Sequence, residues 1–155
     1  MSLTTPEQIR NFYVLGDDIA TGGQPLPDQF AALKKAGFDM VINLALADSP
    51  GAVKNEVDII HDLGMIYKHI PVNFHAPMPD DLDLFFRNME FHRGKRIFVH
   101  CALNWRVSCF MFLYRTVKCG CPVEQAMRDL HAIWQPDAIW QHFIDTVLDS
   151  YNHKI

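Results

Sequence analysis

The chain has 155 residues, of which 49% are hydrophobic and 21% are charged, as in a globular protein with a substantial core. Its formal net charge of −4 argues against nucleic acid and against an anionic membrane as partners, because both attract basic proteins. No apolar run is long enough to span a bilayer, and residues 1–10 contain no signal-peptide core. We therefore expect a cytoplasmic, single-domain protein.

The first half of the chain alternates short strands with helices. Residues 1–10 are polar, and we expect them to be loosely attached. Apolar runs bounded by turn residues predict strands at residues 12–15, 19–21, 40–44 and 66–70. Apolar residues at helical spacing predict helices from Pro27 to Gly37 and from Val53 to Gly64, each ended by its glycine.

The second half continues this alternation. A long loop at residues 72–79 precedes a predicted helix at 82–89, and a strand follows at 97–99. Three further helices are predicted at residues 107–117, 122–130 and 139–148. Strands that alternate with helices indicate βαβ units, so we predict an α/β fold with a mostly parallel central sheet and helices on both faces.

The most informative stretch runs from Arg96 to Tyr114. An apolar strand ends at His100 and Cys101, a short turn follows, and the chain then continues as a helix that is apolar on nearly all sides. The amides of such a turn and of the helix N-terminus bind anions, and the same field favours the reactive thiolate of a cysteine. Arg106 adds a planar donor group that matches phosphate oxygens.

The other three cysteines are Cys109, Cys119 and Cys121, and all lie in the last third of the chain. This distribution does not indicate a disulfide framework. Cys119 and Cys121 lack a second ligand pair, so they are interpreted as part of a helix-ending turn rather than a metal site. We predict no metal and no cofactor. The plain alternative for Cys101 is a buried cysteine without a chemical role.

These residues resemble the signature of the protein tyrosine phosphatase superfamily, which is His-Cys, five residues, Arg and then Ser or Thr. Asn104 stands where the family has glycine, and asparagine tolerates the positive φ required there. Arg106 comes one residue early, and Val107 occupies the usual arginine position. Either the loop is one residue short, or Arg106 reaches the phosphate from the preceding position; the retained place of Ser108 favours the second.

The resemblance extends over roughly residues 10–148. It includes Gly23-Gln24-Pro25, the strand Val41–Leu44 and Ile70-Pro71-Val72. These segments resemble a bacterial dual-specificity-type phosphatase-like domain that also occurs fused to beta-lactamase-hydrolase-like proteins. The resemblance implies a single phosphatase-like domain over residues 1–155 that acts on a phosphorylated small molecule or phosphoprotein. The sequence carries no signal for an oligomeric state.

The resemblance also implies roles for individual residues. Cys101 would attack phosphorus and form a phosphocysteine, and Ser108 would hydrogen-bond its sulfur. The phosphate oxygens would be held by Ala102, Leu103, Asn104, Trp105, Arg106 and Val107. His100 would orient the loop, although a strand-end side chain turned into the core is an equal interpretation.

A general acid must protonate the leaving oxygen. The family's aspartate belongs in the loop before the helix that precedes the Cys101 strand, and this loop contains none. His75 is the first candidate, followed by Asp80 or Asp81. Asp137 lies in a Trp-Gln-Pro-Asp stretch and is interpreted as a helix-starting residue. Because the sequence offers no good general acid, we expect the protein to prefer aryl phosphates, whose leaving groups need little protonation.

Two other functions remain open at this stage. A rhodanese-like sulfurtransferase also carries a cysteine loop before a helix, and its loop is shorter by one residue. A catalytically weak phosphate-binding module would keep the anion site without turnover. Trp105 is interpreted either as a hydrophobic wall for an aromatic substrate or as a residue that packs on the protein surface.

Overall fold

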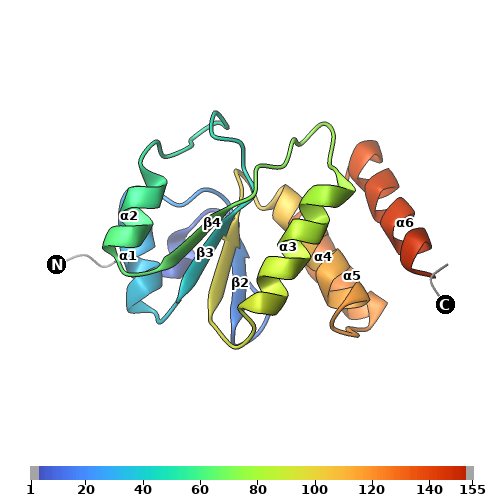
Figure 1. Cartoon of the computed structure of the whole chain (residues 1–155), viewed down its shortest axis with the longest axis horizontal. Helices are drawn as coiled ribbons and strands as arrows, with labels where there is room; N and C mark the ends of the chain where they lie inside the picture. Colours follow the sequence, from blue (N-terminus) through green and yellow to red (C-terminus); the bar gives the residue numbers. More distant parts are fainter. Residues whose placement is uncertain (1–3, 153–155) are drawn as a thin grey trace.

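A five-stranded sheet runs through the centre of the computed structural model, which describes residues 4–152 (Figure 1). The strands are β1 (Tyr13–Val14), β2 (Ile19–Gly22), β3 (Met40–Asn43), β4 (Ile66–His69) and β5 (Ile97–His100). They lie in the order β1-β2-β5-β3-β4, and the short edge strand β1 is antiparallel to β2 while all other pairs are parallel. The predicted, mostly parallel sheet is therefore confirmed.

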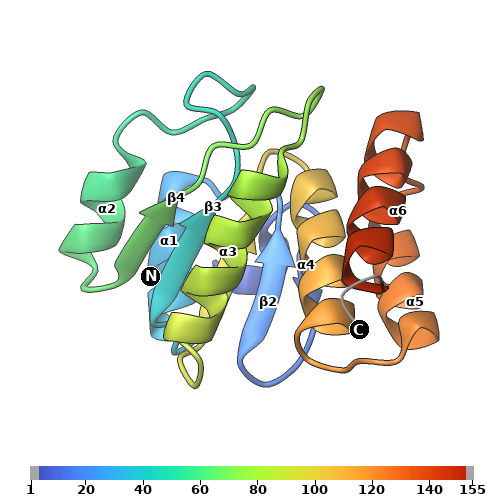
Figure 2. The ribbon, with the colours of Figure 1, turned by 45° about the vertical axis from the view of Figure 1, so that its right-hand side comes forward.

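Helices cover both faces of this sheet, as predicted (Figures 1 and 2). The helices α1 (Pro27–Lys35) and α2 (Glu56–Asp62) lie on one face. The other face carries α3 (Pro79–Phe91), α4 (Trp105–Val117), α5 (Val123–Ile133) and α6 (Ala138–Asn152). All four residues of β5 are buried, because β5 is central and both of its faces are covered by helices.

The carboxyl ends of the parallel strands meet at one edge of the sheet. Asn43 pairs in register with both His69 and His100, and Gly22 pairs with His100 from the other side. The segments that follow β3, β4 and β5 all rise above this edge in Figure 1. Ligands of open α/β sheets bind at such an edge, so the fold brings three loops together around Cys101.

Two predictions about local structure were wrong. Residues 5–10 are docked rather than loosely attached: Pro6–Gln8 form a short 3₁₀ helix, and Ile9 is only 2% exposed in the cluster that contains Phe30. Met1–Leu3 lie outside the described residues. Ile139 is among the apolar residues from which the helix at 139–148 was predicted, but it is 44% exposed, and Trp140 is buried instead.

Candidate active site

The turn that follows Cys101 is fixed by an asparagine with a left-handed backbone. Asn104 has a φ of 70°, as its place in the signature predicted, and α4 begins at the next residue. Its side-chain amide donates to the Asn11 carbonyl and to the Thr21 hydroxyl, both at 2.9 Å. Because Asn104 is fully buried, these two bonds hold the turn in one conformation.

The N-terminal part of the chain lies directly against this turn. A Cβ atom on Gly23 would meet the Ala102 carbonyl oxygen at 2.6 Å, so only glycine fits there. The Gln24 backbone N–H donates to the same carbonyl at 3.0 Å, and the Asn11 side chain donates to the Leu103 carbonyl at 2.9 Å. With these carbonyls held by the N-terminal segment, the turn is fixed on one side.

Cys101 and Arg106 line one pocket of about 340 Å³ at the start of α4. Arg106 is buried, and its guanidinium donates to the Val72 carbonyl at 2.9 Å. The first amides of any α-helix have no acceptor within the helix, so those at the start of α4 can serve an anion. The pocket thus combines a thiol, a guanidinium and a helix N-terminus, which suits a phosphate group.

One side of the pocket is lined by Phe74 and Trp105, and together with Trp134 and Trp140, which pack behind them, these residues form an aromatic wall. Trp105 stacks on Trp134 with ring centroids 4.8 Å apart and an angle of 3° between the planes. Phe74 lies 5.9 Å from each of these rings, and the Trp140 indole donates to the Phe74 carbonyl at 2.8 Å. Trp105 therefore both packs on the protein and lines the pocket, and its contact with an aromatic substrate stays a prediction.

Ser108 does not make the expected hydrogen bond to the Cys101 sulfur. Its hydroxyl donates to the Trp105 carbonyl at 2.7 Å and accepts from the Trp134 indole at 2.9 Å. The reason is geometric, because positions 106 and 108 lie about 200° apart around a helix and cannot face the same side. With Arg106 directed at the pocket, Ser108 supports the aromatic wall instead.

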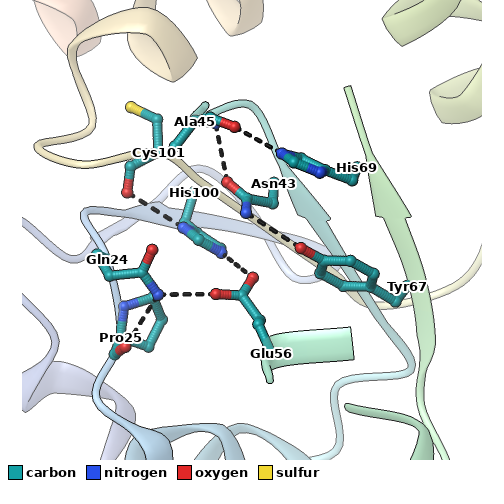
Figure 3. A network of polar contacts seen from close by, with 9 residues as sticks. All are labelled: Gln24, Pro25, Asn43, Ala45, Glu56, Tyr67, His69, His100 and Cys101. Atoms are coloured by element: carbon teal, nitrogen blue, oxygen red, sulfur yellow. Dashed lines mark hydrogen bonds and ion pairs between the residues drawn. The ribbon is translucent and has the colours of Figure 1, made fainter. Parts of the chain in front are cut away.

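The side of the loop opposite the aromatic wall is a buried polar network of Gln24, Asn43, Glu56, Tyr67 and His100 (Figure 3). The His100 Nε2 atom lies 2.7 Å from the Glu56 carboxylate, and Nδ1 lies 3.1 Å from the Cys101 carbonyl oxygen. His100 is fully buried and contacts the loop, and its role in orienting the loop stays a prediction. No sequence motif indicated Glu56, which lies 44 residues earlier on α2.

The ionisation of this network follows from its contacts. Burial alone would raise the pKa of Glu56, but hydrogen bonds from His100, the nearby His100 charge, and hydrogen bonds from Gln24 and Tyr67 together lower it. Burial and then the Glu56 charge raise the pKa of Tyr67, so its hydroxyl keeps its proton. The Tyr67 hydroxyl accepts a hydrogen bond from the Asn43 amide at 3.1 Å.

The candidate general acids are separated by the fold. His75 lines the pocket with Cys101, whereas Asp80 and Asp81 lie in the first turn of α3 and do not. Burial and then the charge of Asp80 raise the pKa of Asp81, but this carboxyl has no access to the pocket. Asp48, in the loop after β3, does line the pocket, and no sequence motif singled it out.

Asp137 accepts a hydrogen bond from the Trp140 amide at 2.9 Å, so its predicted place at a helix start is confirmed. Cys109 is buried as expected, and burial raises the pKa of its thiol. Cys119 is exposed and Cys121 is partly exposed, at the turn between α4 and α5. Within residues 4–152, no group of three or more His, Cys, Asp or Glu side chains could hold a metal ion.

Known structures share this arrangement over nearly their full length. A protein from Shewanella putrefaciens CN-32, described as a candidate phosphatase of the DUF442 family, is 33% identical, with a TM-score of 0.84. The alignment covers 94% of this chain and 95% of that one. The chain belongs to the DUF442 family. The fold is the one that the sequence resemblance indicated, because it is shared with protein tyrosine phosphatase structures.

Structures with lower sequence identity share the fold of this DUF442 protein. Tk-PTP in its active form is 19% identical with a TM-score of 0.73, and the match covers 93% of this chain and 97% of that one. PTPMT1 in complex with PI(5)P is 11% identical with a TM-score of 0.77, and here the coverage is 92% and 97%. No protein-family model and no curated protein matches the sequence.

The match to a DUF442 protein that is described as a candidate phosphatase supports phosphatase activity in general. The proteins that this DUF442 member matches are phosphatases. In the part of the chain that the structure describes, no helix has the length and apolar character needed to cross a bilayer.

Proposed function

We propose that this DUF442 protein is a cysteine-dependent phosphatase that hydrolyses phosphate monoesters through a phosphocysteine. The observation that carries the proposal is that Cys101 and Arg106 line the same pocket at the N-terminus of α4. An anion in this pocket would be within reach of a nucleophile, a guanidinium and the first amides of a helix. These are the groups that phosphoryl transfer requires.

In the first step, the Cys101 thiolate attacks phosphorus, the S–P bond forms and the P–O bond to the leaving group breaks. Arg106 and the amides of residues 102–107 hold the three non-reacting oxygens, where charge is spread in the transition state. In the second step, water attacks the phosphocysteine, inorganic phosphate leaves and the thiolate is restored. No cofactor takes part in this scheme.

We assign the general acid to His75, which would give its proton to the leaving oxygen. His75 lines the pocket, and its backbone amide is held by the Asn73 side chain at 2.9 Å. Asp48, in the loop after β3, is the alternative because it lines the same pocket.

The aromatic wall supports an aryl phosphate as the preferred substrate. The lining of the pocket is mostly apolar apart from Arg106, His75 and the neighbouring loop residues. An aromatic ring attached to a phosphate bound between Cys101 and Arg106 could stack on Trp105, whose flat surface is held by Trp134. The physiological substrate would then be a phosphotyrosine-like or other aryl monoester.

Hydrolysis of p-nitrophenyl phosphate across pH, by the wild type and by Cys101→Ser, tests the proposal. We expect turnover by the wild type, a loss of at least about a thousandfold in the variant, and unchanged binding of phosphate by both. Acid quenching should trap a phosphorylated wild-type protein and no phosphorylated variant. Phosphate binding without turnover in either protein would instead identify a phosphate-binding module.

A further inference from the structure

A second pocket lies beside the one that contains Cys101, and we call it the side pocket. It has a volume of about 470 Å³ and is lined by the N-terminal segment, the start of α1 and its preceding loop, and the loop after β3. Pro50 and Ala102 line both pockets, so the two adjoin at the residue that directly follows the nucleophile. A molecule bound through its phosphate at Cys101 can therefore extend into the side pocket.

The lining of the side pocket is polar and carries one positive charge. Within the described part of the chain, Arg10 is the one charged residue that lines it. Amide side chains supply most of the other polar groups, and these belong to Gln8, Gln24 and Gln29. The Arg10 guanidinium forms no ion pair within residues 4–152, so its donors are available to a ligand. The pocket is thus locally positive on a chain whose net charge is −4.

The carboxylates of the neighbouring elements are placed elsewhere. Glu56 is 4% exposed and accepts a hydrogen bond from the Gln24 side chain at 2.8 Å. Asp28, in the first turn of α1, accepts a hydrogen bond from the Thr4 hydroxyl at 3.3 Å. Asp48 lines the pocket that contains Cys101 and not the side pocket. Among the described residues, no carboxylate lining the side pocket competes with a ligand for Arg10.

The backbone that carries Arg10 is fixed against the nucleophile turn. The Arg10 carbonyl accepts a hydrogen bond from the Gly23 N–H at 2.7 Å, and a Cβ atom on Gly23 would meet this carbonyl oxygen at 3.2 Å. The next residue, Asn11, has a left-handed φ of 53°, and its side chain donates to the Leu103 carbonyl at 2.9 Å. Only the side chain of Arg10 has to become ordered when a ligand binds, which keeps the entropic cost of binding small.

The amide side chains of the side pocket are also held in place. Oε1 of Gln29 accepts a hydrogen bond from the Leu26 N–H at 2.7 Å, and Nε2 of Gln29 donates to the Gln8 carbonyl at 3.2 Å. Nε2 of Gln24 donates to the Pro25 carbonyl at 3.0 Å (Figure 3). These bonds fix the orientation of both amides, so the side pocket is largely preformed, as is usual for ligand sites.

We propose that the side pocket is a second substrate subsite, which binds an anionic group on an aryl phosphate whose phosphate lies at Cys101. Arg10 holds this second group by charge-assisted hydrogen bonds, because its planar guanidinium matches the oxygens of a carboxylate or a phosphate. The substrate class is thereby narrowed to aryl phosphates that carry a second anion. This inference rests on the proposed function for its catalytic consequence, whereas binding to the subsite can be measured without turnover.

The position of Arg10 determines which kinetic constant it affects. Arg10 lies outside the pocket in which bonds form and break, so it binds the ground state and the transition state equally. Such binding lowers KM and leaves kcat unchanged. Because Arg10 is exposed, the attraction is modest and is screened by salt. We therefore expect a KM advantage of about fivefold at low ionic strength and a smaller one in high salt.

Three matched substrates test the proposal. They are phenyl phosphates with a two-carbon chain in the meta position that ends in a carboxylate, a phosphonate or a neutral amide. The wild type should have a KM about fivefold lower for the two anionic compounds than for the amide. This ratio should fall to about one in Arg10→Gln and below one in Arg10→Glu, which repels the second anion. Arg87→Gln, at an exposed position on α3, is the matched control and should keep the wild-type ratio.

Calorimetric binding of the three compounds to Cys101→Ser separates the subsite from the reaction. Tighter binding of the anionic compounds, in a protein whose wild type has no turnover, would support the subsite and refute the proposed function. Turnover by the wild type with equal KM for all three compounds would overturn the subsite and leave the proposed function in place. A wild-type ratio that persists in Arg10→Gln would also overturn it. The tighter of the two anionic compounds indicates whether the second group is a carboxylate or a phosphate.

Discussion

The nucleophile loop lies between two regions that differ in chemistry and in access to solvent. The buried polar network lies on the side of α1 and α2, and its central pair, His100 and Glu56, is at most 5% exposed. The aromatic wall lies on the side of α3 to α6, and Trp105 and Phe74 are partly exposed where they line the pocket. One region is closed to ligands and the other is open to them.

This difference separates two tasks that meet at Cys101. A group that no substrate can touch influences every substrate equally, so the closed region can hold the backbone of the nucleophile loop without affecting selectivity. The open region holds Arg106 and the rings that a substrate would contact, so it can determine which phosphate esters bind. Substitutions on the two sides should therefore have different kinetic signatures.

The largest effect on the open side is expected for Arg106→Lys. Lysine keeps the positive charge but loses the planar fork and the hydrogen bond to the Val72 carbonyl. We expect kcat/KM for p-nitrophenyl phosphate to fall at least about 100-fold, as when one transition-state donor is removed.

Arg87→Lys, at an exposed position on α3, is the matched control and should retain full activity. Steady-state kinetics of both variants across pH provide the measurement. If Arg106→Lys retained the wild-type kcat/KM, the guanidinium would have no role in the reaction, contrary to its assigned place on the open side.

A smaller effect is expected at the general acid. His75→Asn should lower kcat about 10- to 100-fold for an alkyl phosphate, and by much less for p-nitrophenyl phosphate, whose leaving group needs little protonation. The matched variant is Asp48→Asn, which removes the other proton carrier in the pocket. Rates for both substrates with each variant decide between them. A selective loss of alkyl phosphate hydrolysis in Asp48→Asn alone would assign the acid to Asp48.

The smallest effect is expected at the rear of the aromatic wall. Trp134→Phe removes the hydrogen bond to Ser108 and part of the stack on Trp105, so we expect unfolding free energy to fall by about 1 kcal/mol. KM for the aryl substrate should rise a few-fold as Trp105 becomes less fixed. Chemical denaturation and steady-state kinetics measure the two effects.

Ser108→Ala removes the same hydrogen bond and leaves both indole rings in place, so it separates the bond from the stack. We expect the loss of stability without the rise in KM. An accumulation of phosphorylated protein in Ser108→Ala would show that the serine acts on the second chemical step, contrary to its contacts in the structure.

The elements of the fold could be predicted because local signals mark them. Apolar runs such as Val41–Leu44 and the glycines Gly37 and Gly64 indicated where strands and helices begin and end, and the parallel sheet followed from their alternation. The docking of Ile9 could not be predicted, because a single apolar residue in a polar stretch has no periodicity. Its burial depends on Phe30 and the sheet beneath it.

The loop of the candidate site could be predicted for the same reason, since His100 to Ser108 are consecutive. The partners that shape its chemistry come from distant segments with no motif of their own. Glu56 lies on α2, Trp134 follows α5, and Asp48 is in an irregular loop. The expected contact of Ser108 with the Cys101 sulfur was wrong, because the direction of this side chain depends on how α4 is rotated about its axis. The shift of Arg106 by one residue changes which positions of α4 face the pocket.

The contacts between Asn11 and the nucleophile turn have a consequence for the order in which the molecule assembles. They join residues 92 and 93 positions apart, and contacts of such long range form late in folding. The segment around Asn11 would thus be synthesised first and reach its native place among the last. A chain whose sheet and helices had already formed would still lack the native turn after Cys101 until the segment around Asn11 docked. Recovery of phosphatase activity would then report the final step of folding.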